Sequence, residues 1–125
     1  MLSDKDTYST IPVSDLEKAK EFYGQKLGFA VEMDTDGGVM YRSGKTFFFV
    51  YPSRMKPGGH TQMSWLVPDI KAEAAELRSK GITFEDYDIP GVKTEDGIMQ
   101  SGPNVRTAWF KDPDGNLLGL TQADS

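Results

Sequence analysis

The chain has 125 residues, of which 38% are hydrophobic and 26% are charged, which is typical of one ordinary globular domain. Its 14 basic residues stand against 19 acidic ones and leave a net charge of −5, which disfavours a nucleic-acid partner because phosphate binding needs clustered Lys and Arg. The absence of cysteine excludes disulfides, thiolate metal sites and a cysteine nucleophile.

The first ten residues, MLSDKDTYST, are polar and acidic. They lack the basic start and the apolar run of a signal peptide, and no stretch approaches the length of a membrane span, about 18 apolar residues. We therefore expect a cytoplasmic protein with no membrane partner.

The first half of the chain is predicted to form a strand, a helix and three further strands. Ser14 and Glu17 form an S-x-x-E capping box, which predicts a helix that begins at Asp15 and ends at Gly28. Apolar residues at helical spacing give this helix one face to bury against a sheet. The strand candidates after it are FAVEM, GVMYR and TFFFVY.

The second half repeats this order. Asp69 is the expected cap of a helix that ends at Gly81. The strand candidate ITFEDY follows, then a long interruption, and then RTAWFK and NLLGLTQ, joined by a Pro-Asp-Gly turn. The sequence thus predicts two βαβββ modules, at about residues 5–57 and 58–123, within one domain that spans 1–125.

These modules resemble those of the vicinal oxygen chelate superfamily, which includes glyoxalase I, extradiol dioxygenases, fosfomycin-resistance proteins and bleomycin-binding proteins. The resemblance rests on V-x-D-[LI] before each helix and F-x-D-P-D-G-N before the last strand, and it covers about Tyr8 to Thr121. It implies an α+β fold in which two βαβββ modules form a curled mixed sheet cup with the helices outside. It also implies a homodimer, formed either by packing of complete two-module chains or by exchange of modules between chains. The frame serves isomerases, oxygenases, transferases and metal-free drug binders, so its motifs indicate fold better than function.

The resemblance further implies four positions at which the enzymes carry His, Glu or Gln ligands to a divalent metal. In this chain those positions hold Tyr8, Phe48, Gln62 and Gly119. A catalytic cation needs about three ligands drawn from imidazole, carboxylate or thiolate. We therefore expect neither a metal nor another cofactor. The alternative is a rearranged site that uses Gln62 or the only histidine, His60.

Strand alternation predicts which side chains line the cup. Ile11, Val13 and Trp65 belong to the apolar set that faces the helices, and the opposite parity, carried across the turns, gives a mixed aromatic and polar lining. Such a lining suits a flat, partly apolar molecule. The predicted ligand-binding residues are Tyr8, Thr10, Met40, Phe48, Val50, Gln62, Ser64, Trp109, Gly119 and Thr121.

The stretch Asp88–Asn104 contains three Gly and two Pro and has no clean period. Long loops inside compact domains are often lids or binding loops, so we expect it to overhang the second half of the cup. A solvated connection is the alternative. The side chains that such a lid would carry are Lys93, Glu95, Asp96 and Met99.

Three functions fit these features. The leading hypothesis is a metal-free protein that sequesters an aromatic or hydrophobic compound, with a part in antibiotic resistance. The second is a lyase, isomerase or dioxygenase that uses His60 and Gln62 in a rearranged metal site, or that has no metal and uses Tyr8, His60 and Gln62 as acid or base groups. The third is a structural or regulatory protein whose cleft is filled by Phe48 and Trp109. The sequence identifies no catalytic residue.

Overall fold

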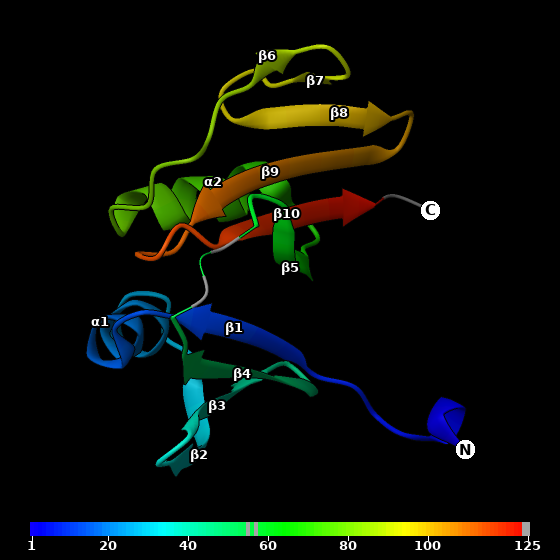
Figure 1. The fold of residues 1–125 in the computed structure, drawn as a ribbon. Coiled ribbons are helices and arrows are strands. Elements are labelled where there is room, and N and C mark those ends of the chain that lie inside the picture. The colour runs from blue at the N-terminus through cyan, green and yellow to red at the C-terminus, as the bar shows by residue number, and fades with distance from the viewer. Residues whose placement is uncertain (55, 57, 124–125) are drawn as a thin grey trace. The chain divides into compact units, whose positions relative to one another are not determined.

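A computed structural model describes residues 1–54, 56 and 58–123 of the chain. It divides into two compact units, Met1–Lys56 and Pro57–Ser125. The predicted module boundary falls at about residue 57, which itself lies outside the described residues. Each unit contains a four-stranded mixed sheet and a helical segment, which confirms the α+β class with two βαβββ modules (Figure 1). That both modules make up one domain stays a prediction.

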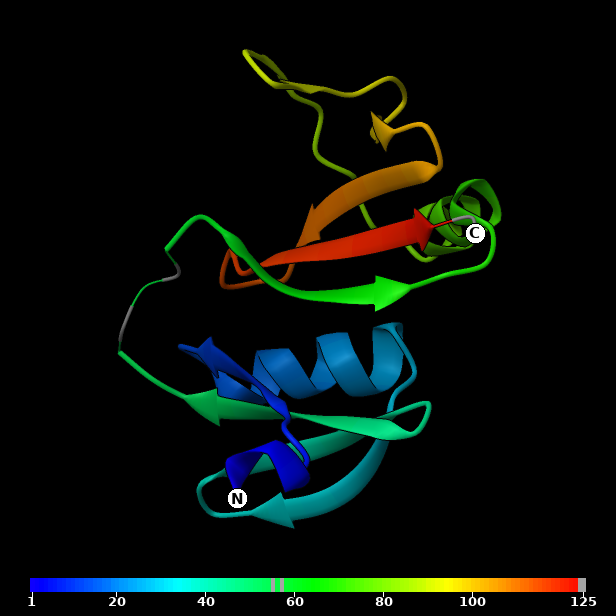
Figure 2. The same ribbon diagram turned by 90° about the vertical axis from the view of Figure 1, so that its right-hand side faces the viewer.

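The first unit forms a sheet with the strand order β1-β4-β3-β2. Strand β1 runs parallel to β4, and the other neighbours are antiparallel. Helix α1 continues directly into a π-helical segment, η2, and Figure 2 shows the two as one helix along one face of the sheet. The elements are η1 (Leu2–Asp4), β1 (Ser9–Val13), α1 (Leu16–Lys20), η2 (Glu21–Lys26), β2 (Ala30–Thr35), β3 (Gly38–Ser43) and β4 (Thr46–Pro52).

The second unit repeats this topology with the order β5-β10-β9-β8 and a parallel pair of β5 and β10. Strands β6 and β7 form a separate two-stranded ribbon. The elements are β5 (Thr61–Leu66), α2 (Ile70–Ser79), β6 (Asp88–Ile89), β7 (Val92–Lys93), β8 (Ile98–Gly102), β9 (Val105–Lys111) and β10 (Leu117–Ala123). In the described part of the chain, no helix has the length and hydrophobicity needed to cross a membrane.

Both long helices begin at an aspartate cap. Asp15 accepts a hydrogen bond from the backbone N–H of Lys18 at 3.2 Å, so the cap is one residue later than the predicted Ser14. Asp69 accepts in the same way from Ala72 at 3.2 Å, as predicted. Each carboxylate satisfies a backbone donor that the first helical turn leaves without a partner.

The edge strand of the second sheet lies inside the stretch predicted to be a loop. The candidate ITFEDY forms only an isolated bridge, between Phe84 and Phe110, and it is not a strand. That bridge is to one end of β9, and β8 pairs with the rest of β9. The expectation of irregular structure over Asp88–Asn104 is therefore wrong, because that stretch contains β6, β7 and β8. That it overhangs the second half of the cup stays a prediction.

A two-residue turn explains where β8 begins. Asp96 and Gly97 both have positive φ, at 52° and 76°, and Glu95 and Ile98 exchange backbone hydrogen bonds at 2.8 and 3.1 Å across them. Asp-Gly is a preferred pair for a turn with two positive φ values, because glycine adopts that conformation without a Cβ clash. The turn folds the chain back so that Ile98 can start a new strand.

The core of each unit lies between its sheet and its helix. In the first unit the buried ring of Phe48 packs against Tyr23 of η2, with centroids 5.5 Å apart. In the second unit Phe110 stacks on Trp65 at 6.1 Å and meets Phe84 edge to face at 5.5 Å. Aromatic contacts of these geometries contribute about 0.5–1.5 kcal/mol each beyond the burial of area.

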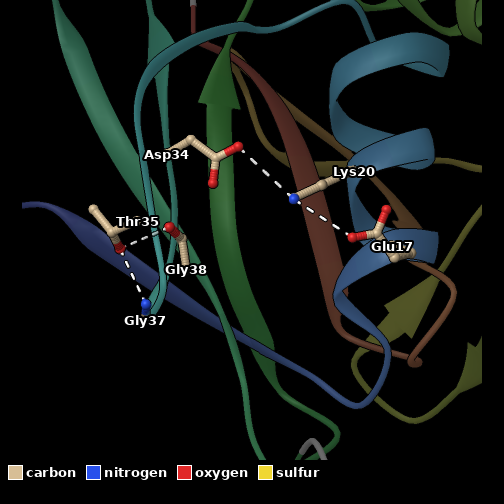
Figure 3. A network of polar contacts seen from close by, with 6 residues as sticks. All are labelled: Glu17, Lys20, Asp34, Thr35, Gly37 and Gly38. Carbon is tan, nitrogen blue, oxygen red and sulfur yellow. Dashed lines mark hydrogen bonds and ion pairs between the residues drawn. The ribbon is translucent and has the colours of Figure 1, made fainter.

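Polar contacts also link the helix of the first unit to the outer strand β2. Figure 3 shows Lys20 between Glu17 and Asp34, with its Nζ 3.5 Å from the Glu17 carboxylate and 3.8 Å from that of Asp34. At the end of β2, the Thr35 hydroxyl donates to the Gly38 carbonyl at 3.0 Å and so closes the turn into β3.

Candidate functional site

Each sheet has one face toward its own helix and a second face that this helix does not cover, which we call the open face. The helix side is identified by the fully buried side chains, such as Ile11 and Val50 in the first unit and Leu118 in the second. Alternation then assigns the intervening residues to the open face. For the first sheet they are Thr10, Met40, Arg42, Phe47, Phe49 and Tyr51, and for the second they are Ser64, Thr107, Trp109, Gly119 and Thr121.

The predicted placement of Phe48 and Val50 on the cup lining is wrong. Their side chains are 1% and 0% exposed, and Phe48 contacts Tyr23 on the helix side. The physical reason is the length of the turn between β3 and β4, which shifts the alternation in β4 by one residue relative to the prediction. Phe49 and Tyr51 hold the open-face positions instead.

The rings of Phe49 and Tyr51 form a stacked pair on this open face. Their centroids lie 6.1 Å apart and their planes differ by 9°. Gly38 on β3 permits this packing, because a Cβ at that position would come within 2.8 Å of the Phe49 ring. Met40, a predicted lining residue, pairs with Phe49 across the strands. The open face therefore offers an aromatic and thioether surface.

A charged group borders that aromatic surface. The Arg42 guanidinium lies 5.8 Å from the centroid of the Phe47 ring, and its Nε donates to the Glu32 carboxylate at 3.1 Å. Phe47 is 37% exposed. The Glu32 carboxylate orients the Arg42 guanidinium over the Phe47 ring. A cation therefore lies next to an apolar surface.

Trp109 is the main aromatic residue on the open face of the second sheet. Its indole Nε1 donates to the Thr61 hydroxyl at 3.1 Å, and Tyr87 meets its ring edge to face with centroids 5.6 Å apart. These two contacts fix the position of the indole. Thr61 and Tyr87 were not predicted as site residues, and Tyr87 ends the candidate strand ITFEDY, which the structure does not form.

A β-bulge explains why Thr61 takes the place predicted for Gln62. Leu117 pairs with Thr61, but the next residue of β10, Leu118, pairs with Met63, so Gln62 is the extra residue in β5. A bulge shifts the alternation of the strand on one side of it by one position. Ser64, which follows the bulge, keeps its predicted face beside Gly119.

Gly119 on β10 lies in close contact with Ser64, its neighbour on the parallel strand β5. A Cβ built at Gly119 would come within 2.5 Å of the Ser64 Oγ and 3.5 Å of the Thr61 Cγ2. The space that a side chain would need is thus filled by the serine hydroxyl. Thr121 pairs with Thr107 on β9 and continues this polar end of the face.

The four positions implied for metal ligands do not fit a divalent-metal site. Tyr8 is 56% exposed ahead of β1, Phe48 is in the core, Gln62 is in the bulge and Gly119 has no side chain. His60 is exposed in the bend just before β5. In the ranges that the structure describes, no three His, Asp or Glu side chains gather closely enough to bind a metal ion. The expectation of a metal-free protein stays a prediction.

Comparisons with known proteins identify the family to which these features correspond. The profile of the glyoxalase/bleomycin resistance protein/dioxygenase superfamily matches residues 7–120. The uncharacterized protein YetH of Bacillus subtilis is 28% identical over 120 residues, which cover 88% of this chain and 91% of that protein.

Solved structures show the same fold. The antibiotic binding protein TnmS3 from Streptomyces sp. CB03234 superposes with a TM-score of 0.69 at 26% identity, covering 96% of this chain and 98% of its own. A glyoxalase family protein from Enterococcus faecalis superposes with a TM-score of 0.72 at 21% identity, covering 97% and 99% of the two chains. At the latter identity the likeness concerns the fold alone.

Proposed function

Because the chain belongs to the glyoxalase/bleomycin resistance protein/dioxygenase superfamily, we propose that it binds a small aromatic or hydrophobic molecule and does so without a metal. The observation that carries this proposal is the set of aromatic side chains on the open faces, above all the stacked pair of Phe49 and Tyr51. Rings left outside the core of a small domain provide flat apolar area on which a ligand can stack.

The polar groups on the second open face support the same function. The Ser64 hydroxyl lies beside Gly119, and the Thr61 hydroxyl accepts the hydrogen bond that fixes the Trp109 indole. A few oriented hydroxyls next to an aromatic ring are typical of sites that bind partly apolar molecules, because the ring supplies area and the hydroxyls supply orientation. TnmS3, at 26% identity, is described as an antibiotic binding protein, and we extend to this chain only the class of ligand.

Sequestration follows from these properties. A protein that binds a toxic aromatic compound and offers no catalytic group lowers its free concentration by mass action. We propose such a role in antibiotic resistance, carried out by a homodimer in the cytoplasm. Light scattering coupled to size-exclusion chromatography tests the dimer, and a mass equal to that of one chain contradicts it.

Tryptophan fluorescence tests the binding proposal. Titration with bleomycin and with flat polycyclic antibiotics is expected to quench the emission saturably, and Trp109→Phe is expected to remove most of the quenching. Trp65→Phe is the matched control, because Trp65 lies on the helix side of its sheet, where it stacks on the buried Phe110, and should not sense a ligand.

A second pair of variants tests whether the stacked rings of Phe49 and Tyr51 form part of the binding surface. Phe49→Ala and Tyr51→Ala are each expected to weaken binding by about tenfold, the usual effect of truncating an aromatic anchor. Phe29→Leu, whose ring packs against the buried Phe48, serves as the control for general loss of packing. If no compound of either class quenches the fluorescence of the wild-type protein, the proposal is wrong and the result supports a structural role.

A further inference from the structure

A hollow lies on the helix side of the second sheet, separate from the open faces. It is a groove of about 680 Å³ whose lining comes from α2, β7, the Asp96-Gly97 turn, β8 and β9. All of these elements belong to one compact unit. The basic residues in the lining are Lys71, Arg78, Lys93 and Arg106.

The position of α2 explains why the groove exists. The helix packs mainly against β9 and β10, the inner strands of the sheet. Ile98 and Gln100 on the edge strand β8 pair with Ala108 and Arg106 and share their helix-side face. Both residues line the groove. The groove is thus the space between the helix and the edge of the sheet that the helix does not fill.

The charge of this lining differs from that of the chain as a whole. The protein carries a net charge of −5, yet four basic side chains meet here against two carboxylates, those of Glu95 and Asp96. Among the described residues, none of the four basic groups makes an ion pair within 4.0 Å, whereas Lys20, Arg42, Lys80 and Lys111 all do. Basic groups gathered without ion pairs attract an anion.

Arg78 is held in place by contacts that leave its charge uncompensated. Its Nη2 donates to the backbone carbonyl of Asp96 at 2.6 Å, and its guanidinium lies 5.1 Å from the centroid of the Phe84 ring. Gly97 is needed for this arrangement, because a Cβ there would come within 3.1 Å of the same Nη2 and 2.9 Å of the Phe84 Cβ. A carbonyl and a ring face orient a guanidinium but carry no full negative charge.

Arg106 is oriented by its neighbour on β8. Its Nε donates to the Gln100 Oε1 at 3.3 Å, and the Gln100 Nε2 donates to the Gly102 carbonyl at 2.6 Å. Among the described residues the Arg106 guanidinium has no other hydrogen-bond or ion-pair partner, so its two terminal nitrogens remain available. A guanidinium fork of this kind matches the two oxygens of a phosphate or a carboxylate.

We propose that this groove binds a small organic molecule that carries phosphate or carboxylate groups, with Arg78 and Arg106 as the direct ligands and Lys71 and Lys93 as supporting charges. The volume is that of a site for a metabolite-sized molecule and exceeds the need of a bare ion. Glu95 and Asp96 can accept hydrogen bonds from hydroxyl or amino groups of the same ligand. This site is independent of the aromatic open faces and of the function proposed for them.

The test uses the full chain and three probes at equal ionic strength: fructose 1,6-bisphosphate, citrate and sodium sulfate. Amide resonances are followed by NMR during each titration. Saturable shifts centred on Gly97, Gln100 and Arg106 with the bisphosphate assign the site to phosphate esters, and the same pattern with citrate assigns it to carboxylates. Shifts with sulfate alone at high concentration, or none near these residues, overturn the proposal.

Matched variants separate a specific site from general charge attraction. Arg106→Gln and Lys71→Gln are expected to weaken binding of the responsive probe, by about tenfold or more for the arginine, because a charge-assisted bidentate contact is lost. Lys45→Gln, in the exposed turn between β3 and β4, removes the same charge elsewhere and should leave the affinity unchanged.

Lys71 is exposed on the helix surface, so Lys71→Gln is expected to fold even if Arg106→Gln does not. Equal affinity of wild type, Arg106→Gln and Lys71→Gln, or an equal loss in Lys45→Gln, overturns the proposal. Quenching by aromatic compounds in Arg106→Gln reports separately on the open faces, so failure of one proposal is distinguishable from failure of the other.

Discussion

At the scale of single residues, Gly119 and Ser64 act as a pair. The Ser64 Oγ occupies the place where a side chain at Gly119 would begin, whereas the Ser64 Cβ is 3.5 Å from that place, an ordinary contact distance. Gly119→Ala is therefore expected to lower the free energy of unfolding by roughly 1 kcal/mol, since the hydroxyl must move. Adding Ser64→Ala should restore most of that loss.

Urea denaturation of the two single variants and the double variant measures this coupling. An interaction energy that favours the double variant by at least about 0.5 kcal/mol supports the pairing. Simple additivity of the two changes would show that the serine hydroxyl does not limit the space at Gly119.

Tyr41 links stability to alkaline pH. Burial, with a smaller contribution from the negative charge of Asp34, raises the pKa of the Tyr41 phenol above its ordinary value of 10.0. Because the folded chain holds this proton more tightly than the unfolded chain, the stabilisation is fully present below pH about 10 and is lost as pH rises through the folded pKa.

Tyr41→Phe cannot ionise, so its stability should fall less steeply than that of wild type between about pH 9 and 11. Urea midpoints across this range provide the measurement. Parallel slopes for wild type and Tyr41→Phe would contradict the assignment.

At the scale of elements, the turn before β8 depends on a glycine. Gly97 has a φ of +76°, and a Cβ at this position would meet the Phe84 Cβ at 2.9 Å. Gly91 has a similar φ of +84°, but a Cβ there would meet no other atom within 4 Å. Comparing alanine at the two sites separates backbone strain from crowding.

Gly91→Ala is expected to destabilise the chain by about 1 kcal/mol, from the left-handed backbone alone. Gly97→Ala should destabilise it by about 1 kcal/mol more, because Phe84 must also move. Chemical denaturation measures both. Equal losses would show that the packing of Phe84 against the turn is loose.

The turn between β9 and β10 is held by a buried carboxylate. Asp112 is 5% exposed and accepts hydrogen bonds from the backbone N–H groups of Asp114 and Asn116, both at 2.9 Å, and from the Asn116 Nδ2 at 2.8 Å. Removal of the carboxylate leaves three donors without this acceptor, so Asp112→Ala is expected to cost about 3 kcal/mol.

Lys20→Met provides the contrast, since the ion pairs of Lys20 are partly exposed and are predicted to contribute less than about 0.5 kcal/mol. Thermal and urea unfolding of both variants checks the ranking. A larger loss in Lys20→Met than in Asp112→Ala would contradict it.

At the scale of the whole molecule, metal content distinguishes a binding protein from a metal-dependent lyase, isomerase or dioxygenase. After incubation with nickel, zinc, manganese or iron and removal of the excess, we expect less than one ion per chain, because the four family positions supply no set of three suitable donors. Gly119→Glu should not restore binding, since it adds one carboxylate only. One tightly held ion per chain in the wild type would favour a rearranged site near His60 and Gln62.

The helices of both modules and most of their strands could be predicted from the sequence because their signals are local. Asp69 caps α2, Pro113 and Gly115 mark the last turn, and apolar spacing identifies both helices. These features act within a few residues of one another and do not depend on the rest of the fold. The family resemblance extends the same local signals to a whole topology.

The composition of the open faces was decided only by the tertiary structure. The turn between β3 and β4 places Phe49 rather than Phe48 on the open face. The bulge in β5 places Thr61 there rather than Gln62. Strand β8 forms in a stretch that has no clean period. In a strand the side chains alternate with a period of two, so a shift of one residue moves every following side chain to the other face. Pairing with the neighbouring strands fixes that shift. Because such pairing joins residues that are far apart in the sequence, local sequence patterns do not determine it.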